Sequence, residues 1–317
     1  MFLAQFVGSN HTCQPFDSSI PNIDIPAEEC YILVRTREPV LAERIRMNPI
    51  SFITANYVGR ELGFHVTEGW MQGDRATNAY FAPIETFEGR FDALLSQIKA
   101  LGFDTIDLWV AQLHWSWATA EHIALARAAL ARHGMRITSL AGGVGATADE
   151  LTAACRLALA LDAPILAGSS PFLKHDRATA IAILQQHGVR LALENHPDEK
   201  TPADILRMIG TDGGGALGTA VDTGWWGTNG YDAAEAIREL RPHIITVHLK
   251  DVLAVGEHLT CVYGQGIVPI EQCVRLLRET GYSGVLGIEH EPFIAPHSYD
   301  PSAECARMLQ MLRGWLR

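Results

Sequence analysis

Short apolar runs alternate with amphipathic segments from residue 50 to the end of the chain. The runs have the length of buried strands, and the segments between them repeat apolar positions at helical spacing. The runs predict eight strands, at residues 51–58, 105–111, 136–141, 164–168, 189–195, 216–222, 244–249 and 285–289. The other segments predict eight helices, at residues 91–101, 120–133, 149–161, 176–187, 202–209, 232–240, 270–280 and 302–316.

The predicted helix ends carry matching local signals. Thr147 and Glu150 have the spacing of a capping box, and Thr201 followed by Pro202 puts a proline at the first helical position. A glycine follows a helix and precedes a strand four times, where a left-handed C-cap is expected: Gly102, Gly134, Gly188 and Gly281. Helix, glycine and strand therefore form a repeating unit.

This repeat predicts the α/β class and, within it, a (β/α)8 TIM barrel as a single domain. We expect the barrel at residues 47–317, after an irregular N-terminal extension at residues 1–46 that prolines interrupt. The extension is either a loose part of the protein or lies upstream of a natural start at Met47. An open doubly wound sheet is the alternative, but Gly142-Gly143-Val144-Gly145 is a weak match to a glycine-rich phosphate loop.

The composition argues against two classes of partner, nucleic acid and membrane. The chain has 25 Lys and Arg against 36 Asp and Glu, a formal net charge of −11, which opposes a nucleic-acid partner. No apolar run approaches the roughly 18 residues of a membrane span. Six cysteines without a C-x-x-C pair predict reduced thiols and a cytoplasmic protein. We expect a small-molecule substrate, no nucleic acid and no membrane, and a homodimer stays open.

The last four predicted strands each end in a side chain that binds metals. In strand order these are Glu194, Asp222, His248 and Glu289. The carboxyl ends of barrel strands meet at one face, and neighbouring strands lie about 4.8 Å apart, so four side chains can close on one ion. Three carboxylates and one imidazole suit one divalent metal ion, Mn²⁺ or Mg²⁺ first and Co²⁺ or Zn²⁺ as alternatives.

The motifs around these residues resemble those of the xylose-isomerase-like barrel superfamily, from about residue 50 onward. The motifs are Leu-Glu194-Asn-His196, Val-Asp222-Thr-Gly, Val-His248-Leu-Lys250-Asp251, Gly264-Gln-Gly266 and Gly-Ile-Glu289. That superfamily holds sugar-phosphate isomerases and epimerases, ketose 3-epimerases, inosose dehydratases and, more remotely, endonuclease IV. The resemblance implies a single divalent metal on these four ligands, and it leaves the substrate open.

The resemblance also implies a reaction. A divalent metal acts as a Lewis acid on a carbonyl and its neighbouring hydroxyl, so that the adjacent C–H is acidified and an enediolate forms. Glu194 and Glu289 then serve as base and acid. Two departures matter: Trp225 stands where ketose epimerases and endonuclease IV usually carry a histidine, and an arginine after strand seven is missing.

Along residues 244–251 a period of two puts Thr246, His248 and Lys250 on one face of the strand, and Val247, Leu249 and Asp251 on the other. Lys250, in a His-Leu-Lys-Asp motif like that of inosose dehydratases, is a candidate proton donor to a leaving hydroxyl, or else a surface lysine or a structural one paired with Asp251.

Candidate substrate-binding residues follow from their positions after strands. His196 shares a face with Glu194, His114 and Trp115 follow the second strand, and Trp225 follows the sixth. Weaker candidates are His65, Trp70 and Glu291, and we place the following histidines outside the site: His133, His187, His243, His258 and His297.

The leading interpretation is therefore a divalent-metal-dependent isomerase or epimerase of a small sugar, sugar phosphate or cyclitol ketone. An inosose dehydratase-like lyase, which eliminates water, is the second interpretation. An endonuclease IV-like repair enzyme is the third, and both Trp225 and the negative charge argue against it.

Overall fold

A computed structural model of the protein describes residues 48–211, 213–294 and 297–317. The predicted extension at residues 1–46 and the alternative start at Met47 lie outside the described residues. Among the helices that the structure describes, none combines the length and the apolar character that crossing a membrane requires.

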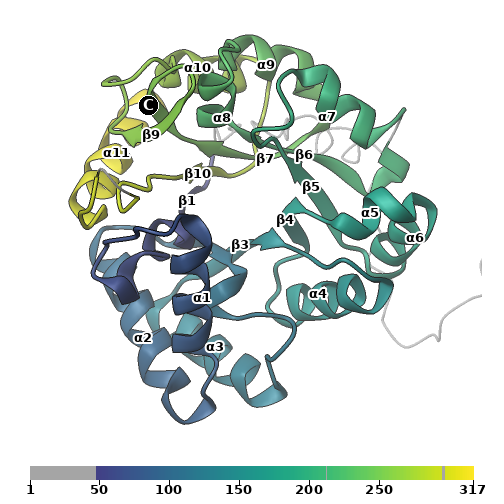
Figure 1. The fold of residues 1–317 in the computed structure, drawn as a ribbon, viewed down its shortest axis with the longest axis vertical. Helices are drawn as coiled ribbons and strands as arrows, with labels where there is room; N and C mark the ends of the chain where they lie inside the picture. The colour runs from purple at the N-terminus through teal and green to yellow at the C-terminus, as the bar shows by residue number, and fades with distance from the viewer. Residues whose placement is uncertain (1–47, 212, 295–296) are drawn as a thin grey trace, which may run out of the picture. The chain divides into compact units, whose positions relative to one another are not determined.

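Eight parallel strands close into a barrel, in the spatial order β1, β10, β7, β6, β5, β4, β3, β2 (Figure 1). Closure comes from β1, which pairs with β2 on one side and with β10 on the other. The barrel strands are β1 Ile50–Ile53, β2 Thr105–Trp109, β3 Arg136–Gly143, β4 Ile165–Ser169, β5 Arg190–Glu194, β6 Leu217–Asp222, β7 Ile244–Leu249 and β10 Leu286–Ile288. The predicted (β/α)8 barrel is confirmed.

The eight predicted helices are present. They are α2 Ile84–Ala100, α3 Ala120–His133, α4 Ala148–Ala160, α6 Arg177–His187, α7 Pro202–Ile209, α9 Ala233–Leu240, α10 Ile270–Glu279 and α11 Ser302–Trp315. Their ends follow the local signals: Thr201 caps α7 with Pro202 at its first turn, and Gly134 and Gly188 adopt left-handed conformations after α3 and α6.

The structure adds elements that the pattern did not predict. Three are helices, α1 Trp70–Phe81, α5 Pro171–His175 and α8 Thr223–Thr228, and two form an antiparallel hairpin outside the barrel, β8 Asp251–Ala254 and β9 Glu257–Cys261. The first predicted strand, 51–58, is too long. It ends at Ile53 and continues as a 3-10 helix, in which the Asn56 amide donates to the carbonyl of Ile288 and accepts the backbone N–H of His290, at the end of the neighbouring strand β10.

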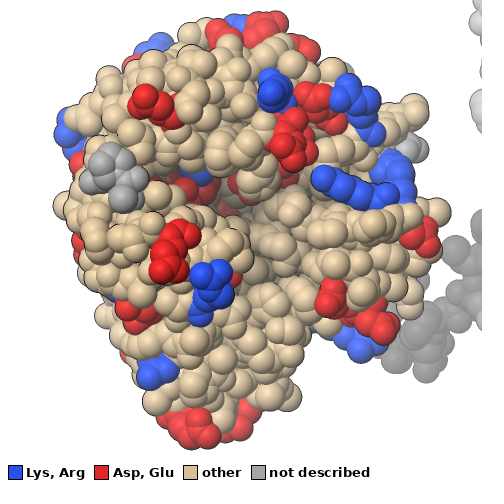
Figure 2. All heavy atoms as spheres, in the orientation of Figure 1, with Lys and Arg blue, Asp and Glu red and all other residues tan. Residues whose placement is uncertain are grey.

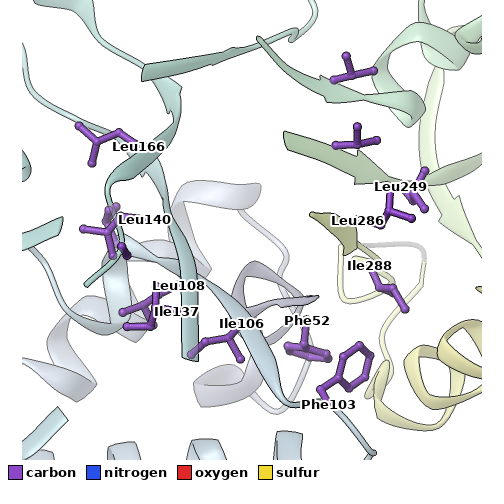
Figure 3. Packing of buried hydrophobic residues seen from close by; sticks show 14 of the residues in the cluster. Phe52, Phe103, Ile106, Leu108, Ile137, Leu140, Leu166, Leu249, Leu286 and Ile288 are labelled. Atoms are coloured by element: carbon purple, nitrogen blue, oxygen red, sulfur yellow. The ribbon is translucent and has the colours of Figure 1, made fainter. Parts of the chain in front are cut away.

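The main apolar core lies between the strands and the surrounding helices. Figure 3 shows part of it, where Phe52 on β1 faces Phe103 just before β2, with ring centroids 5.3 Å apart. Val247 and Leu249 on β7 belong to the same cluster. These are the outward positions of β7, as the period-two pattern predicted, so Thr246, His248 and Lys250 point inward.

Small side chains fill the inside of the barrel below the carboxyl ends of the strands. Ala167, Ala192 and Ala220 form a separate buried cluster on β4, β5 and β6. At Gly287 on β10 an added Cβ would lie 2.9 Å from Ile53 and 3.0 Å from Asp107, so the interior has no room for a larger residue there. Glu194, Asp222 and Glu289 lie two residues further along β5, β6 and β10, at the carboxyl end of the barrel.

Candidate active site

Four buried polar side chains stand at the carboxyl ends of neighbouring strands. Glu194 is the last residue of β5, Asp222 of β6, and Glu289 directly follows β10, while His248 is next to last in β7. The register pairs Asp222 with His248 across β6 and β7, and His248 with Gly287 across β7 and β10. Strand order and register therefore bring together side chains that are far apart in sequence.

His248 lies between two glutamates. Its Nδ1 is 2.5 Å from Glu194 Oε1 and 3.4 Å from Glu289 Oε2, and all three side chains are buried. One ligand atom from each of the three lies within 4.8 Å of the others. This is a ligand set of the size and type that a divalent cation uses.

Several buried atoms of this group lack hydrogen bonds. They are His248 Nε2, Glu289 Oε2 and Asp222 Oδ2. Buried polar atoms are almost always paired. Asp222 Oδ2 has the ammonium group of Lys250 beside it at 3.1 Å and Glu289 Oε2 has the His248 ring at 3.4 Å, so each oxygen makes an ion pair and keeps a lone pair for a further cation. An ion bound by carboxylate oxygens and an imidazole nitrogen is such a cation, so these residues fit a divalent metal.

Asp222 has two functions, one for each oxygen. Its Oδ1 accepts the backbone N–H groups of Gly224 at 2.7 Å and Trp225 at 3.0 Å, which caps the short helix α8. Its Oδ2 faces the site. The backbone of Asp222 is held by the Asn195 amide, which donates to its carbonyl and accepts its N–H, both at 2.9 Å. Asn195 therefore aligns the ends of β5 and β6.

Lys250 is neither a surface lysine nor the partner of Asp251. Its side chain is 3% exposed, and its Nζ lies 3.1 Å from Asp222 Oδ2, 2.9 Å from Glu289 Oε1 and 3.4 Å from Glu291 Oε2. Asp251 points the other way and accepts three backbone N–H groups of the following loop, from Gly264, Gly266 and Val268. Lys250 is thus an internal cation of the site.

Burial and ion pairing shift the proton affinities of these groups in opposite directions. Burial raises the pKa of Asp222 to about 6, against the opposing effect of Lys250. Burial alone would also raise the pKa of Glu289, but the charges of Lys250 and His248 outweigh it and lower that pKa. Burial raises the pKa of Glu291 well above its usual range. Against its burial, the charge of His248 also lowers the pKa of Glu194, so both glutamates beside His248 favour the ionised form, in which a carboxylate can accept a proton.

A cleft of about 410 Å³ opens above the cluster. Its polar floor includes Glu194, Asp222, Lys250 and the two glutamates after β10, and its walls include Trp70, Trp109, Trp225 and Ile294. In the space-filling view, acidic side chains are visible inside the recess near the middle of the molecular face (Figure 2). The arrangement combines an ionisable floor with flat apolar walls.

His258, which we predicted to lie outside the site, lines this cleft, so that prediction is wrong. The β8–β9 hairpin carries it to Trp225, on which it stacks with ring centroids 3.5 Å apart and planes 7° apart. Its Nε2 is 3.4 Å from Lys250 Nζ, and its Nδ1 is 2.8 Å from Thr228 Oγ1. Because an ammonium group only donates, Nε2 accepts and Nδ1 carries the proton. Burial and the charge of Lys250 lower the pKa of His258 to about 2, so the ring is neutral.

The other predicted substrate residues divide into two groups. His196 and Trp225 line the cleft, and the weaker candidates Trp70 and Glu291 do so as well. His114 and Trp115 are not among its lining residues: His114 bonds Ser116 and Trp115 bonds the carbonyl of Gly143. Trp109 takes the aromatic position on that side, because β2 ends there and the chain turns into a 3-10 helix.

The fold places this cluster at the carboxyl ends of the strands of a (β/α)8 barrel. The chain belongs to the xylose isomerase-like TIM barrel family, whose model matches residues 95–313.

Individual relatives and structures agree with that family. The chain is 33% identical over 75 residues to L-ribulose-5-phosphate 3-epimerase UlaE of Escherichia coli, which is 24% of either protein. It spans at most 40% of the length of the curated relatives it matches.

Two solved structures show the same fold. One is a xylose isomerase-like TIM barrel protein from Mycobacterium smegmatis in complex with magnesium, with a TM-score of 0.57, 21% identity and coverage of 73% of this chain and 90% of that one. The other is the probable 3-DHS dehydratase AsbF from Bacillus anthracis, with a TM-score of 0.57, 15% identity and coverage of 84% and 98%.

Proposed function

We propose that this protein is a divalent-metal-dependent isomerase or epimerase that acts on a small sugar, sugar phosphate or cyclitol ketone. The observation that carries the proposal is the pair Glu194 and Glu289, which both contact His248 and both line one cleft. The E. coli relative, a sugar-phosphate 3-epimerase, supports a reaction of this kind.

Glu194, His248 and Glu289 would hold the ion, with Asp222 Oδ2 as the fourth ligand. A bound divalent ion supplies a Lewis acid that polarises the substrate carbonyl and its neighbouring hydroxyl, which acidifies the C–H beside them. We take Mn²⁺ or Mg²⁺ as the metal because the donors are mostly carboxylate oxygens. A bound magnesium in the M. smegmatis structure supports the harder end of this range.

The two glutamates then move the proton. One carboxylate removes the proton from the carbon next to the carbonyl, and the other glutamate, as an acid, returns a proton to the substrate. His196, whose Nε2 is 3.6 Å from Glu194 Oε2, and Trp225 bind and orient the substrate. The aromatic walls exclude water from the reacting carbon.

A lyase is the second candidate, and Lys250 favours it. Its ammonium group lines the cleft 2.9 Å from Glu289, so it is placed to give a proton to a leaving hydroxyl after Glu289 or Glu194 has removed the C–H proton. The likeness to the B. anthracis dehydratase is one of fold. Localisation in the cytoplasm, the absence of nucleic-acid and membrane partners and a homodimer stay predictions.

The test is hydrogen exchange in D₂O with metal-loaded protein and a panel of ketoses and inososes. Deuterium at the carbon next to the carbonyl without loss of water supports isomerisation, and a dehydrated product supports the lyase. Glu194→Gln and Glu289→Gln should each lower the rate by about 10²-fold or more. Glu85→Gln, on the exposed first turn of α2, is the matched control. Wild-type exchange in both cleft variants would rule out the assigned roles.

A further inference from the structure

The described floor of the cleft offers an anionic substrate no cation that is free of an ion pair. Its described lining carries four carboxylates, Glu194, Asp222, Glu289 and Glu291, against the single ammonium of Lys250. That ammonium is already ion-paired with three of the four. With all four carboxylates ionised and the imidazoles neutral the formal charge is −3, and protonation of Glu291, whose pKa burial raises, makes it −2, so a divalent ion leaves no net positive charge.

A neighbouring cavity of about 270 Å³ shares Glu194 and His196 with the cleft, so it is where a longer substrate would extend. Its lining offers one more cation, Lys174, together with Asp198 and Glu199. The two acidic residues outnumber the lysine even without Glu194. A phosphate at the far end of a sugar would meet net negative charge there as well.

The walls of the cleft suit an uncharged ring instead. Trp70 and Trp109 meet at right angles, with centroids 5.4 Å apart, and the Trp109 Nε1 donates to Asp74 at 2.7 Å. Trp225 is fixed by its stack on His258. Rigid indole faces bind the C–H face of a sugar or cyclitol through apolar contact, which needs no charged group on the ligand.

We infer that the substrate is an uncharged ketose or cyclitol ketone, and that the site rejects its phosphorylated or carboxylated counterparts. This inference rests on the proposed function and narrows it. A phosphate dianion would lose its water in this partly dry cleft without gaining a cation that is free of an ion pair, and the acidic residues of the neighbouring cavity would repel it.

The test is calorimetric titration of Mg²⁺-loaded protein with matched pairs, a ketohexose against its 6-phosphate and a cyclitol against its monophosphate. At low ionic strength the neutral member should bind at least about tenfold more tightly, which corresponds to ~1.4 kcal/mol. The gap should narrow at high ionic strength because salt screens the repulsion. Equal or tighter binding of the phosphates, or failure of every neutral member to bind, would overturn the inference.

A charge variant sharpens the test. Asp198 is exposed and lines only the neighbouring cavity, so Asp198→Lys should raise the affinity for the ketohexose 6-phosphate severalfold and leave the neutral ketose unchanged. Glu279→Lys, at the end of α10, makes the same charge change elsewhere and should alter neither affinity. An equal rise in both variants would contradict the inference. Deuterium exchange in the same samples reports on the proposed function separately, since neutral ligands that bind without exchange would contradict that function alone.

Discussion

Replacing Lys250 by methionine tests whether this lysine acts as the internal cation of the site. The substitution keeps most of the side-chain volume and removes the ammonium group that touches Asp222 and Glu289. Without it, both carboxylates stay buried, 1% and 8% exposed, with no cation beside them except His248.

The expected loss in the free energy of unfolding follows from the burial of these two carboxylates. Removing one partner of a buried ion pair typically costs about 3–5 kcal/mol. The low end applies near neutral pH, because the pKa of Asp222 is already about 6 and a proton is then available to neutralise it. A loss of about 3 kcal/mol corresponds to a fall in Tm of roughly 6–12 °C. The same change should tighten divalent-metal binding at least about tenfold, since no ammonium competes for the carboxylates.

Thermal unfolding in EDTA and calorimetric titration with Mn²⁺ measure the two effects. Added Mn²⁺ should restore most of the lost stability, while the exchange or dehydration rate falls. Lys174→Met is the control, because Lys174 is exposed and should change the stability by less than about 0.5 kcal/mol. An unchanged Tm in EDTA, or weaker metal binding by the Lys250 variant, would refute the reasoning.

Other predictions concern neighbouring features. His258 has a pKa of about 2, against a reference of 6.5 when unfolded, so its contribution to stability is complete above pH 6.5 and falls by about 1.4 kcal/mol per unit below it. Urea unfolding at pH 7 and pH 5 should therefore show a smaller loss for His258→Asn than for wild type, whereas the exposed His175→Asn should behave like wild type. In Gly224→Ala the new Cβ would lie 2.6 Å from Lys250 Cγ, so the lysine must move and turnover should fall, while Gly89→Ala, with nothing within 4 Å, should keep full activity. Chelation should lower the Tm, and Mn²⁺ at about 100 times its Kd should restore about 2.7 kcal/mol, as differential scanning fluorimetry can check.

The barrel was predictable because its repeat is local. Apolar runs, capping residues such as Thr201 and glycines such as Gly134 each determine their own element, and α3, α7 and β7 have the predicted bounds. The period of two also placed Lys250 on the face of His248, which the ion pairs confirm.

What the sequence could not show depends on contacts between distant segments. The helix α8 reads Thr-Gly-Trp-Trp-Gly-Thr, a poor helix sequence that forms because Asp222 caps it. The helix α1 begins after Gly69 without a side-chain cap. No motif in the sequence around His258 indicates a site residue, since only the folded hairpin brings it to Trp225 and Lys250. His114 and Trp115 were plausible by position, but Trp70 and Trp109 line the cleft.

The β8–β9 hairpin supplies part of the cleft wall but is not part of the barrel sheet. Its two strands pair with each other and with no barrel strand among the described residues. Its turn at Val255 and Gly256 can therefore change in length, and His258 on β9 can be substituted, while β7 and His248 stay in register. Residues 253–258 are therefore the first positions to randomise when a change of accepted substrate is sought, whereas Thr260, whose hydroxyl accepts the backbone N–H of Glu291, should be kept.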